Sequence, residues 1–324
     1  MAKSRNSAEI SVVVPAYKCE KCVEELYSRL IAVLEKITGS FEIIFVNDAS
    51  PENDWEIISA ICKKDERVRG INFSKNFGQH RAITAGIDFA NGDWVVVMDC
   101  DLQDEPEEIE KLFSKAIEGY DIVLARRSSR KDNIIRKKFS RMFAKVFMYF
   151  TETNVDDTVA NFGIYSKKVI ESYRELNEQN RNFTLLIQWL GFSPVYVNVE
   201  HSKRLKGKSS YTYKKLFNLA LDSIISQSNK PLRISIKFGF VMSLISLIYG
   251  LFLVIRHYAI NIYVQGWTSL MVSLFFLSGL LLANMGLLGL YIGKIFDEAK
   301  NRPIYIISEL INVHNKNSEK DTEK

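Results

Sequence analysis

Two patterns of hydrophobic positions alternate between residues 10 and 125. Short apolar runs, ISVVVP, FEIIFVN and DWVVVMD, have the length and the β-branched content of buried strands. Between them, apolar residues recur every three or four positions, as at Val23, Leu26, Leu30 and Leu34, which predicts amphipathic helices. Such alternation predicts an α/β fold, a Rossmann-like, mainly parallel sheet with helices on both faces.

Two longer apolar runs occupy the C-terminal third. Residues 238–255 and 267–293 contain no charged side chain, and each is long enough to cross a hydrocarbon core of about 30 Å as a helix. Lysines and arginines flank the outer ends of this pair, whereas the connecting stretch RHYAINIYVQG carries one arginine. This asymmetry predicts a multi-pass protein of the inner (plasma) membrane, with the α/β domain and both termini in the cytoplasm.

These patterns divide the 324 residues into four segments. We expect an α/β domain over 1–211, an amphipathic juxtamembrane segment over 212–233, a transmembrane hairpin over 234–293 and a cytoplasmic tail over 294–324. The stripe of apolar residues in the second segment is typical of an interfacial helix, and a helix packed in a core would show the same stripe. The opening MAKSRNSAEI has no apolar core, so no secretory signal is expected.

The charge is nearly balanced overall, with 43 basic and 38 acidic residues, but one segment is strongly basic. RRSSRKDNIIRKKFSR, residues 126–141, is either a solvated surface or a region that attracts acidic headgroups and phosphate, with Arg136 among the candidates. Nucleic acid is not an expected partner, because no aromatic platform or recognition motif accompanies these charges.

Four cysteines are present, and Cys19 and Cys22 have the C-x-x-C spacing of zinc and redox sites. No second pair follows, and no histidine stands at ligand spacing from the first. We therefore expect packed or solvated free thiols, which suit a reducing compartment.

Acidic residues gather where the strand in VVVMDCDLQDEPEE ends. Asp99 and Asp101, two residues apart on an extended chain, point the same way, while Cys100 points in the opposite direction. Two carboxylates, with water and phosphate oxygens completing six positions, suit Mg²⁺ or Mn²⁺. Asp48 follows another strand, and ligands of parallel sheets bind beyond such strand ends.

The remaining acids of that stretch indicate the start of a helix. Asp104 is expected to cap a helix that begins with Pro106, because proline and acidic residues suit a first turn. Glu105, Glu107 and Glu108 are then structural. Neither a G-x-G-x-x-G after the first strand nor a Walker motif occurs, so dinucleotide-dependent oxidoreductases and P-loop enzymes lose their main support.

Taken together, SVVVPAYKCE, VNDAS, NFSKNFGQHRAITAGI and MDCDLQDEPE resemble the successive motifs of GT-A glycosyltransferases that act on polyprenyl phosphates. This group includes dolichol-phosphate mannose synthase and bacterial undecaprenyl-phosphate glucosyltransferases with two C-terminal membrane helices. The resemblance runs from about residue 10 to about residue 308. It implies metal-dependent, inverting transfer of a sugar from a nucleotide sugar, UDP-linked by analogy with the bacterial members, to undecaprenyl phosphate at the cytoplasmic membrane face. The expected partners are then the nucleotide sugar, the polyprenyl phosphate and the lipid bilayer. We also expect the chain to form a homo-oligomer.

The resemblance also assigns roles to individual positions. Residues implied in donor binding are Pro15, Tyr17, Glu20, Asp48 and Asp99. Metal ligands would be Asp99, Asp101 and Gln103, and the last two also count as catalytic. Arg126 or Arg127 would face phosphate, and HSKRLKGKSSY matches an R-x-x-G-x-S-x-Y motif that would close over phosphate with Arg204, Ser209 and Tyr211.

The identity of a general base stays open. Many relatives carry an acid where this chain has Asn161, a position implied in sugar contact, and Asp157 is a nearby candidate base that is out of register. A phosphate monoester has its second pKa near 6, so an acceptor oxygen can attack without losing a proton. The metal-binding acids are therefore expected to matter more than a base.

Three alternatives remain. A processive polysaccharide synthase would normally carry Q-x-x-R-W, whereas LLIQWLG places Gln188 next to Trp189. A GDP-mannose-dependent polyprenyl-phosphate mannosyltransferase would differ only in its donor. A catalytically silent membrane scaffold is disfavoured by the intact Asp48, Asp99 and Asp101.

Overall fold

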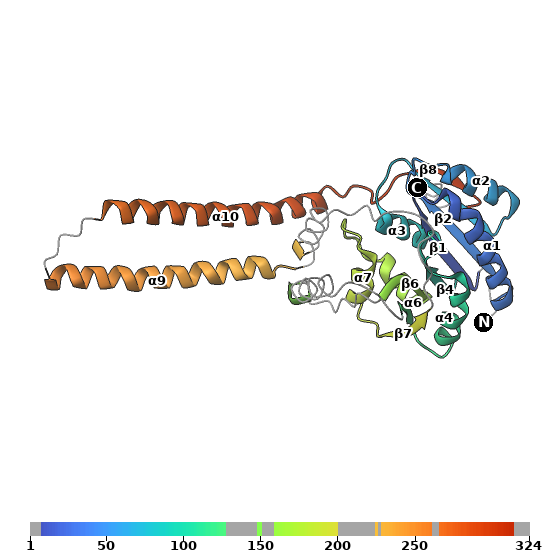
Figure 1. Cartoon of the computed structure of the whole chain (residues 1–324), viewed down its shortest axis with the longest axis horizontal. Coiled ribbons are helices and arrows are strands. Elements are labelled where there is room, and N and C mark those ends of the chain that lie inside the picture. The colour runs from blue at the N-terminus through green and yellow to red at the C-terminus, as the bar shows by residue number, and fades with distance from the viewer. Residues whose placement is uncertain are drawn as a thin grey trace, which may run out of the picture. The chain divides into compact units, whose positions relative to one another are not determined.

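The structure is a computed structural model that describes residues 8–127, 148–150, 159–199, 224–225, 228–260 and 266–313. The chain forms two compact units (Figure 1). The first comprises residues 1–137, 153–209 and 302–324, and the second comprises residues 138–152 and 210–301. The domain boundaries expected from the sequence stay predictions.

An eight-stranded sheet forms the centre of the first unit, in the order β7-β5-β6-β4-β1-β2-β3-β8. The strands are β1 (Ile10–Ala16), β2 (Phe41–Asn47), β3 (Val68–Phe73), β4 (Trp94–Val97), β5 (Ile122–Arg127), β6 (Val159–Ser166), β7 (Pro194–Val199) and β8 (Ile307–Ile311). Strands β4, β1, β2 and β3 run parallel, whereas β6 and β8 pair antiparallel with β4 and β3. The carboxyl ends of β1, β2 and β4 therefore lie at the same end of the sheet.

Helices cover both faces of this sheet, as the sequence predicts. Alternate side chains of β1 pack to opposite sides, Val12 and Val14 into one core and Val13 into the other. The first core also receives α1 (Glu20–Ile37), α2 (Asp54–Lys64) and α4 (Ile109–Ala116). The second receives α3 (Gln79–Phe89), α6 (Lys167–Arg174) and α7 (Phe183–Trp189). The α/β class is confirmed.

Helix α3 lies unusually close to β1. A Cβ atom at Gly86 would come within 2.2 Å of Cγ1 of Val13, which is shorter than any van der Waals contact. Glycine at this position therefore lets the helix axis approach the sheet. This packing places the N-terminus of α3 beside the carboxyl ends of β1 and β4.

The C-terminal residues form a strand that the sequence analysis missed, because it treated 294–324 as a tail. Strand β8 pairs with the outer edge of β3, and Nδ2 of Asn312 donates to the carbonyl oxygens of Cys62 at 2.6 Å and Val68 at 2.9 Å. Tyr305 donates to Asp88 at 2.8 Å and stacks on Phe73 with 5.3 Å between ring centroids. The last part of the chain thus belongs to the first unit.

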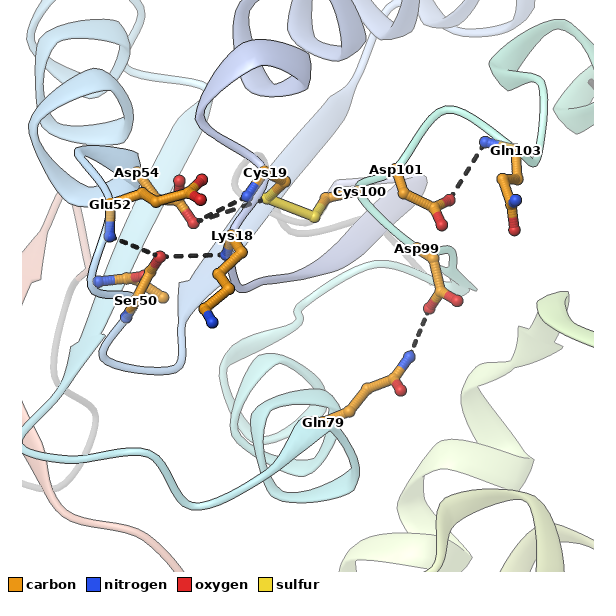
Figure 2. Close-up of a disulfide and its surroundings, with 11 residues drawn as sticks. Lys18, Cys19, Ser50, Glu52, Asp54, Gln79, Asp99, Cys100, Asp101 and Gln103 are labelled. Atoms are coloured by element: carbon orange, nitrogen blue, oxygen red, sulfur yellow. Dashed lines mark hydrogen bonds between the residues drawn. A yellow bond between two sulfur atoms is a disulfide. The ribbon is translucent and has the colours of Figure 1, made fainter. Parts of the chain in front are cut away.

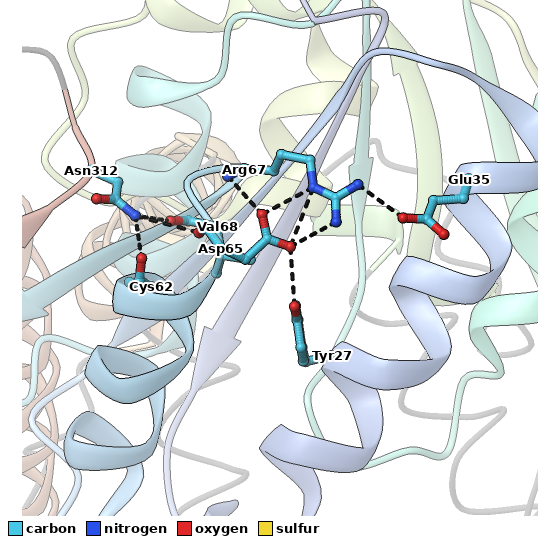
Figure 3. Close-up of polar contacts among 7 residues, drawn as sticks. All are labelled: Tyr27, Glu35, Cys62, Asp65, Arg67, Val68 and Asn312. Atoms are coloured by element: carbon cyan, nitrogen blue, oxygen red, sulfur yellow. Dashed lines mark hydrogen bonds and ion pairs between the residues drawn. The ribbon is translucent and has the colours of Figure 1, made fainter.

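A polar network lies beside these Asn312 contacts, where α2 leads into β3 (Figure 3). Arg67 donates through Nη2 to Asp65 at 2.8 Å and through Nη1 to Glu35 of α1 at 3.0 Å. The hydroxyl of Tyr27 donates to Asp65 at 3.0 Å. These contacts, above all the hydrogen bonds from Arg67, hold the pKa of Asp65 below its ordinary value.

The second unit contains two long helices, α9 (Lys230–Ile260) and α10 (Trp267–Ala299). Ser235, near the start of α9, donates to Asn284 in the C-terminal half of α10, so the helices form an antiparallel hairpin. The hydroxyl of Tyr291 donates to the carbonyl oxygen of Ser228 at 2.7 Å and joins the same ends again.

Both predicted apolar runs lie within these helices, 238–255 in α9 and 267–293 in α10. By length and hydropathy, one helix among the described residues qualifies as a membrane span, Ser273–Ala299, with a mean hydropathy of 1.9. Large apolar side chains are exposed along both helices, including Phe240, Leu251 and Phe275. One apolar helix is therefore established as a candidate span, and the two-span hairpin stays a prediction.

Candidate active site

The candidate site lies beyond the carboxyl ends of the central strands, where the loops after β1, β2 and β4 meet the N-terminus of α3. Because β1 and β4 are parallel neighbours, residues that follow them come together although about 80 positions separate them in the sequence. Figure 2 shows Lys18 and Cys19 on one side and Asp99 and Asp101 on the other, with Gln79 reaching up from α3.

Asp99 and Asp101 are half-buried at this edge. Oδ1 of Asp99 accepts a hydrogen bond from Nε2 of Gln79 at 2.6 Å, and Oδ1 of Asp101 accepts one from the backbone N–H of Gln103 at 3.2 Å. Leu102 has a φ of 58°, a left-handed conformation that turns the chain back after Asp101. Both carboxylates lie on the side away from Cys100, which is directed into the core (Figure 2).

The carboxylate oxygens of Asp99 and Asp101 are ligands of the kind that a hard divalent cation prefers. Among the described residues, no group of three or more His, Cys, Asp or Glu side chains could hold a metal ion. Two partly exposed carboxylates leave the other coordination positions to water and to oxygens of a bound diphosphate, the arrangement that Mg²⁺ and Mn²⁺ favour. Gln103 contacts Asp101 through its main chain, and ligation by its side chain stays a prediction.

Asp48 anchors the loop that leads into α3. Its buried carboxylate accepts hydrogen bonds from the backbone N–H groups of Phe77 at 2.6 Å and Gly78 at 2.9 Å. Gly78 has a φ of 97°, which a residue with a side chain rarely adopts. Burial raises the pKa of Asp48, and the two backbone hydrogen bonds oppose that rise. Asp48 thereby fixes the position from which Gln79 reaches Asp99, and its contact with the nucleotide stays a prediction.

The loop after β1 is held by the loop after β2. The backbone N–H of Lys18 donates to Oγ of Ser50 at 3.0 Å, and that of Cys19 donates to the fully buried Asp54 at 3.2 Å. Among the residues predicted to bind the donor, Pro15 is buried within β1, whereas Tyr17 is 44% exposed. Glu20 starts α1 and accepts from Asn53 at 3.3 Å. Among the residues predicted to bind the sugar donor, Tyr17 thus presents an aromatic ring to solvent.

The expectation of free cysteines is wrong for two of the four. Cys19 and Cys100 form a disulfide, with their Cα atoms 6.4 Å apart, while Cys22 and Cys62 are free. The cause is topological, because the exits of β1 and β4 bring the two positions together at a separation that a disulfide can span. Spacing along the sequence had suggested only the Cys19–Cys22 pair.

The predicted cap at Asp104 is also wrong. A short 3-10 turn, η1 (Pro106–Glu108), precedes α4, and its N-cap residue is Glu105 without a side-chain capping bond. Asp104 is instead buried. Glu107 has a structural partner, since Arg29 of α1 donates to it through Nε at 2.9 Å. This pair ties the segment after Asp99 and Asp101 to α1.

The predicted phosphate-binding residues are only partly described. Arg126 lies in β5 with its guanidinium 4.5 Å from the ring centroid of Tyr196, and Arg127 ends the same strand. Asn161 accepts from the hydroxyl of Thr184 at 3.3 Å. The residues that lie outside the described part of the chain are Arg136, Asp157, Arg204, Ser209 and Tyr211. Their roles stay predictions.

Two polar residues of the site escaped the sequence analysis, Gln79 and Asp54. Gln79 stands directly after Gly78 at the start of α3, and a polar side chain at a helix start beside two strand exits is the signal that could have indicated it. Asp54 carries no comparable signal, since its acceptor role depends on the packing of α2 against the loop after β1.

Comparison with known proteins gives a consistent picture. Residues 11–174 match the family described as glycosyl transferase family 2. An uncharacterised glycosyltransferase of Synechocystis is 37% identical over 93% of this chain and 95% of its own length. A prophage-derived bactoprenol glucosyl transferase of Shigella flexneri is 36% identical over 93% of this chain and 98% of its own.

Solved structures with low sequence identity share the fold. Mannosyl-3-phosphoglycerate synthase of Rubrobacter xylanophilus superimposes with a TM-score of 0.51 at 13% identity, covering 70% of this chain and 74% of that enzyme. Glucosyl-3-phosphoglycerate synthase of Mycobacterium tuberculosis gives a TM-score of 0.50 at 16% identity, covering 69% and 81%. With the family match and the two full-length relatives, these findings confirm the predicted glycosyltransferase fold. The chain is a family 2 glycosyltransferase.

Proposed function

We propose that this glycosyltransferase transfers a sugar from a UDP-linked donor to a polyprenyl phosphate, with undecaprenyl phosphate as acceptor. The observation that carries the proposal is the pair Asp99 and Asp101 at the sheet edge, in a chain similar over nearly its whole length to bactoprenol glucosyl transferases. The long apolar helix Ser273–Ala299 supports an acceptor that resides in a membrane.

Asp99 and Asp101 are the residues that would hold Mg²⁺ or Mn²⁺ against the donor diphosphate. A cation bound there supplies positive charge for the diphosphate that departs. Gln79 holds Asp99 in place, and Asp48 holds the loop that carries Gln79. These contacts hold the Asp99 carboxylate in position, which lowers the cost of ordering it when the donor binds.

The acceptor needs little help from a base. A phosphate monoester already carries about −1.5 to −2 charges at pH 7, so one of its oxygens can form the new bond to the anomeric carbon while the bond to the diphosphate breaks. Attack from the face opposite the leaving group inverts the anomeric centre. On this account Asp157 is not essential as a base, while Asn161 contacts the sugar and the arginines Arg126, Arg127, Arg136 and Arg204 face phosphate.

We further propose that α9 and α10 both cross the membrane, with the first unit and both termini in the cytoplasm. Exposed apolar side chains on both helices support this arrangement, since such surfaces are stable against lipid or protein. Assembly of several copies stays a prediction.

The test places the full-length protein in vesicles that contain undecaprenyl phosphate and Mg²⁺ or Mn²⁺, with radiolabelled nucleotide sugars supplied one at a time. The proposal predicts label in the organic extract with a UDP-sugar. Label with GDP-mannose alone would identify a mannosyltransferase, and label in insoluble polymer a processive synthase. Absence of label in both fractions across the donors would leave the scaffold interpretation.

A further inference from the structure

The disulfide connects the two loops on which the proposed function depends. Cys19 lies between Tyr17 and Glu20, in the loop assigned to the donor, and Cys100 lies between the two metal-site acids. We propose that Cys19 and Cys100 form a redox modification site, at which reduction by a small dithiol loosens the Asp99–Asp101 loop and weakens binding of a nucleoside diphosphate with its divalent cation. This inference rests on the proposed function, since that function names the ligand.

The position of the disulfide shows why it supports binding rather than blocking it. Both cysteines belong to the core under α1, with exposed fractions of 5% for Cys19 and 7% for Cys100. The carboxylates of Asp99 and Asp101 lie on the opposite side of the loop (Figure 2). The oxidised form therefore leaves the ligand face open while it fixes the backbone behind it.

The cross-link adds a covalent restraint to the backbone pairing that already joins β1 and β4. The loop after β1 is held from the β2 side, by Ser50 and Asp54. The disulfide extends this support to the β4 side, across 81 positions of sequence. A cross-link that holds a binding loop in its bound position lowers the ordering cost that binding would otherwise incur.

The chemistry balances with a dithiol as the reductant. One thiolate of the dithiol attacks a sulfur of the pair, the Cys19–Cys100 bond breaks, and a mixed disulfide forms. The second thiol then attacks this intermediate and leaves as part of a cyclic disulfide. Both cysteines end as thiols, and the dithiol has supplied two electrons and two protons. Because the sulfurs are buried, we expect reduction to require transient opening of the loops.

The experiment uses the full chain in detergent, either oxidised with glutathione disulfide or reduced with dithiothreitol and desalted without oxygen. Peptide mapping under non-reducing conditions reports the Cys19–Cys100 link, and titration with UDP in the presence of Mn²⁺ reports affinity. We expect the linked peptide in the oxidised sample only, and an affinity about three- to tenfold weaker after reduction. Re-oxidation should restore it.

Variants separate this pair from the other cysteines. Cys100→Ser should bind like the reduced protein under both conditions, whereas Cys22→Ser, which alters a free cysteine close to the pair in sequence, should respond as the unmodified chain does. Equal affinities in the two wild-type samples would overturn the inference without any variant, as would failure to detect the linked peptide. So would loss of the response in Cys22→Ser.

The sugar-transfer assay distinguishes this inference from the function on which it rests. Transfer that is present and identical in both redox states contradicts the redox site alone. UDP–Mn²⁺ affinity that responds to the redox state without any sugar transfer contradicts the proposed function alone. Absence of UDP–Mn²⁺ binding in both states contradicts both.

Discussion

Asp99 accepts a hydrogen bond from a side chain 20 residues earlier in the chain, the amide of Gln79 at 2.6 Å. A hydrogen bond from a neutral amide leaves the carboxylate charged and orients one of its oxygens. Removing a group that holds a metal ligand in this way typically costs about ten- to a hundredfold in metal affinity or activity. Gln79 is therefore a positioning residue for Asp99.

Replacing Gln79 with alanine should weaken the dependence of sugar transfer on Mn²⁺, raising the concentration for half-maximal rate by about tenfold. Saturating Mn²⁺ should recover most of the rate, because the carboxylate itself remains. The matched control is Gln179→Ala, which removes a surface amide that donates to the carbonyl of Arg302 at 2.8 Å. Metal titrations that coincide for the Gln79 variant and the unmodified chain would contradict the positioning role.

At the scale of single residues, the sequence indicates the site acids better than their surroundings. Asp99 and Asp101 follow a recognisable buried strand, so their place beyond the end of that strand could be predicted. The hydrogen bond from Gln79 to Asp99 could not be predicted, because it depends on how α3 lies beside the end of β4. The disulfide between Cys19 and Cys100 could not be predicted either, because it depends on the pairing of β1 with β4. Pairings across a sheet are set by topology, and one sequence does not specify them.

At the scale of elements, the Asp65 network joins α1, α2 and β3 (Figure 3). Arg67 is 43% exposed, so solvent screening reduces what the ion pairs contribute, whereas the Asp65 side chain is only 10% exposed. Because the folded pKa of Asp65 lies below its unfolded value, its contribution to stability is complete above the unfolded pKa. The contribution is lost as the pH falls through the folded pKa.

Replacing Asp65 with asparagine should lower the free energy of unfolding by about 1 kcal/mol at pH 7. The difference from the unmodified chain should shrink as the pH falls from about 5 through the lowered folded pKa of Asp65, below which the carboxylate is neutral in both states. Thermal unfolding of the full chain in detergent across this range provides the measurement. As a control, Asp93→Asn removes an exposed acid whose ion pair with Lys167 spans 3.9 Å. A difference for Asp65→Asn that stays constant with pH would contradict the assignment.

The helices and central strands could be predicted because their periodicities are strong, as in the stripe that α1 buries. Strand β8 could not, because Ile307–Ile311 is a short run that becomes a strand only by pairing with the edge of β3. The antiparallel placement of β6 beside β4 was missed for the same reason. Edge and inserted strands depend on partners rather than on local pattern.

At the scale of the whole molecule, the chain combines a glycosyltransferase unit with a helical hairpin whose two members are 31 and 33 residues long. At 1.5 Å per residue, each is longer than the hydrocarbon core of a bilayer. The apolar runs could be read from the sequence, whereas the helices extend beyond them, α9 over Lys230–Ile260 and α10 over Trp267–Ala299. The side of the membrane on which each end lies is inferred from charge alone.

The proposed topology places residues 256–266 outside the cytoplasm. A cysteine at Gln265, in a chain whose free Cys22 and Cys62 are replaced by serine, should react with a membrane-impermeant maleimide in intact cells. A cysteine at Ile117, which is 65% exposed in the first unit, should react only after lysis. Labelling of the Gln265 position only after lysis, or of Ile117 in intact cells, would contradict the proposed orientation.

The central claim is that Asp99 and Asp101 support sugar transfer to a lipid phosphate by holding a divalent cation. The most direct measurement compares label transferred from a UDP-sugar to undecaprenyl phosphate by the unmodified chain, by the same chain in EDTA, and by Asp101→Asn, which keeps the size of the side chain but removes its charge. The account predicts transfer in the first sample, and loss of at least about a hundredfold in the other two, since the diphosphate charge is no longer neutralised. Equal transfer with and without EDTA, or an active and folded Asp101→Asn variant, would contradict it.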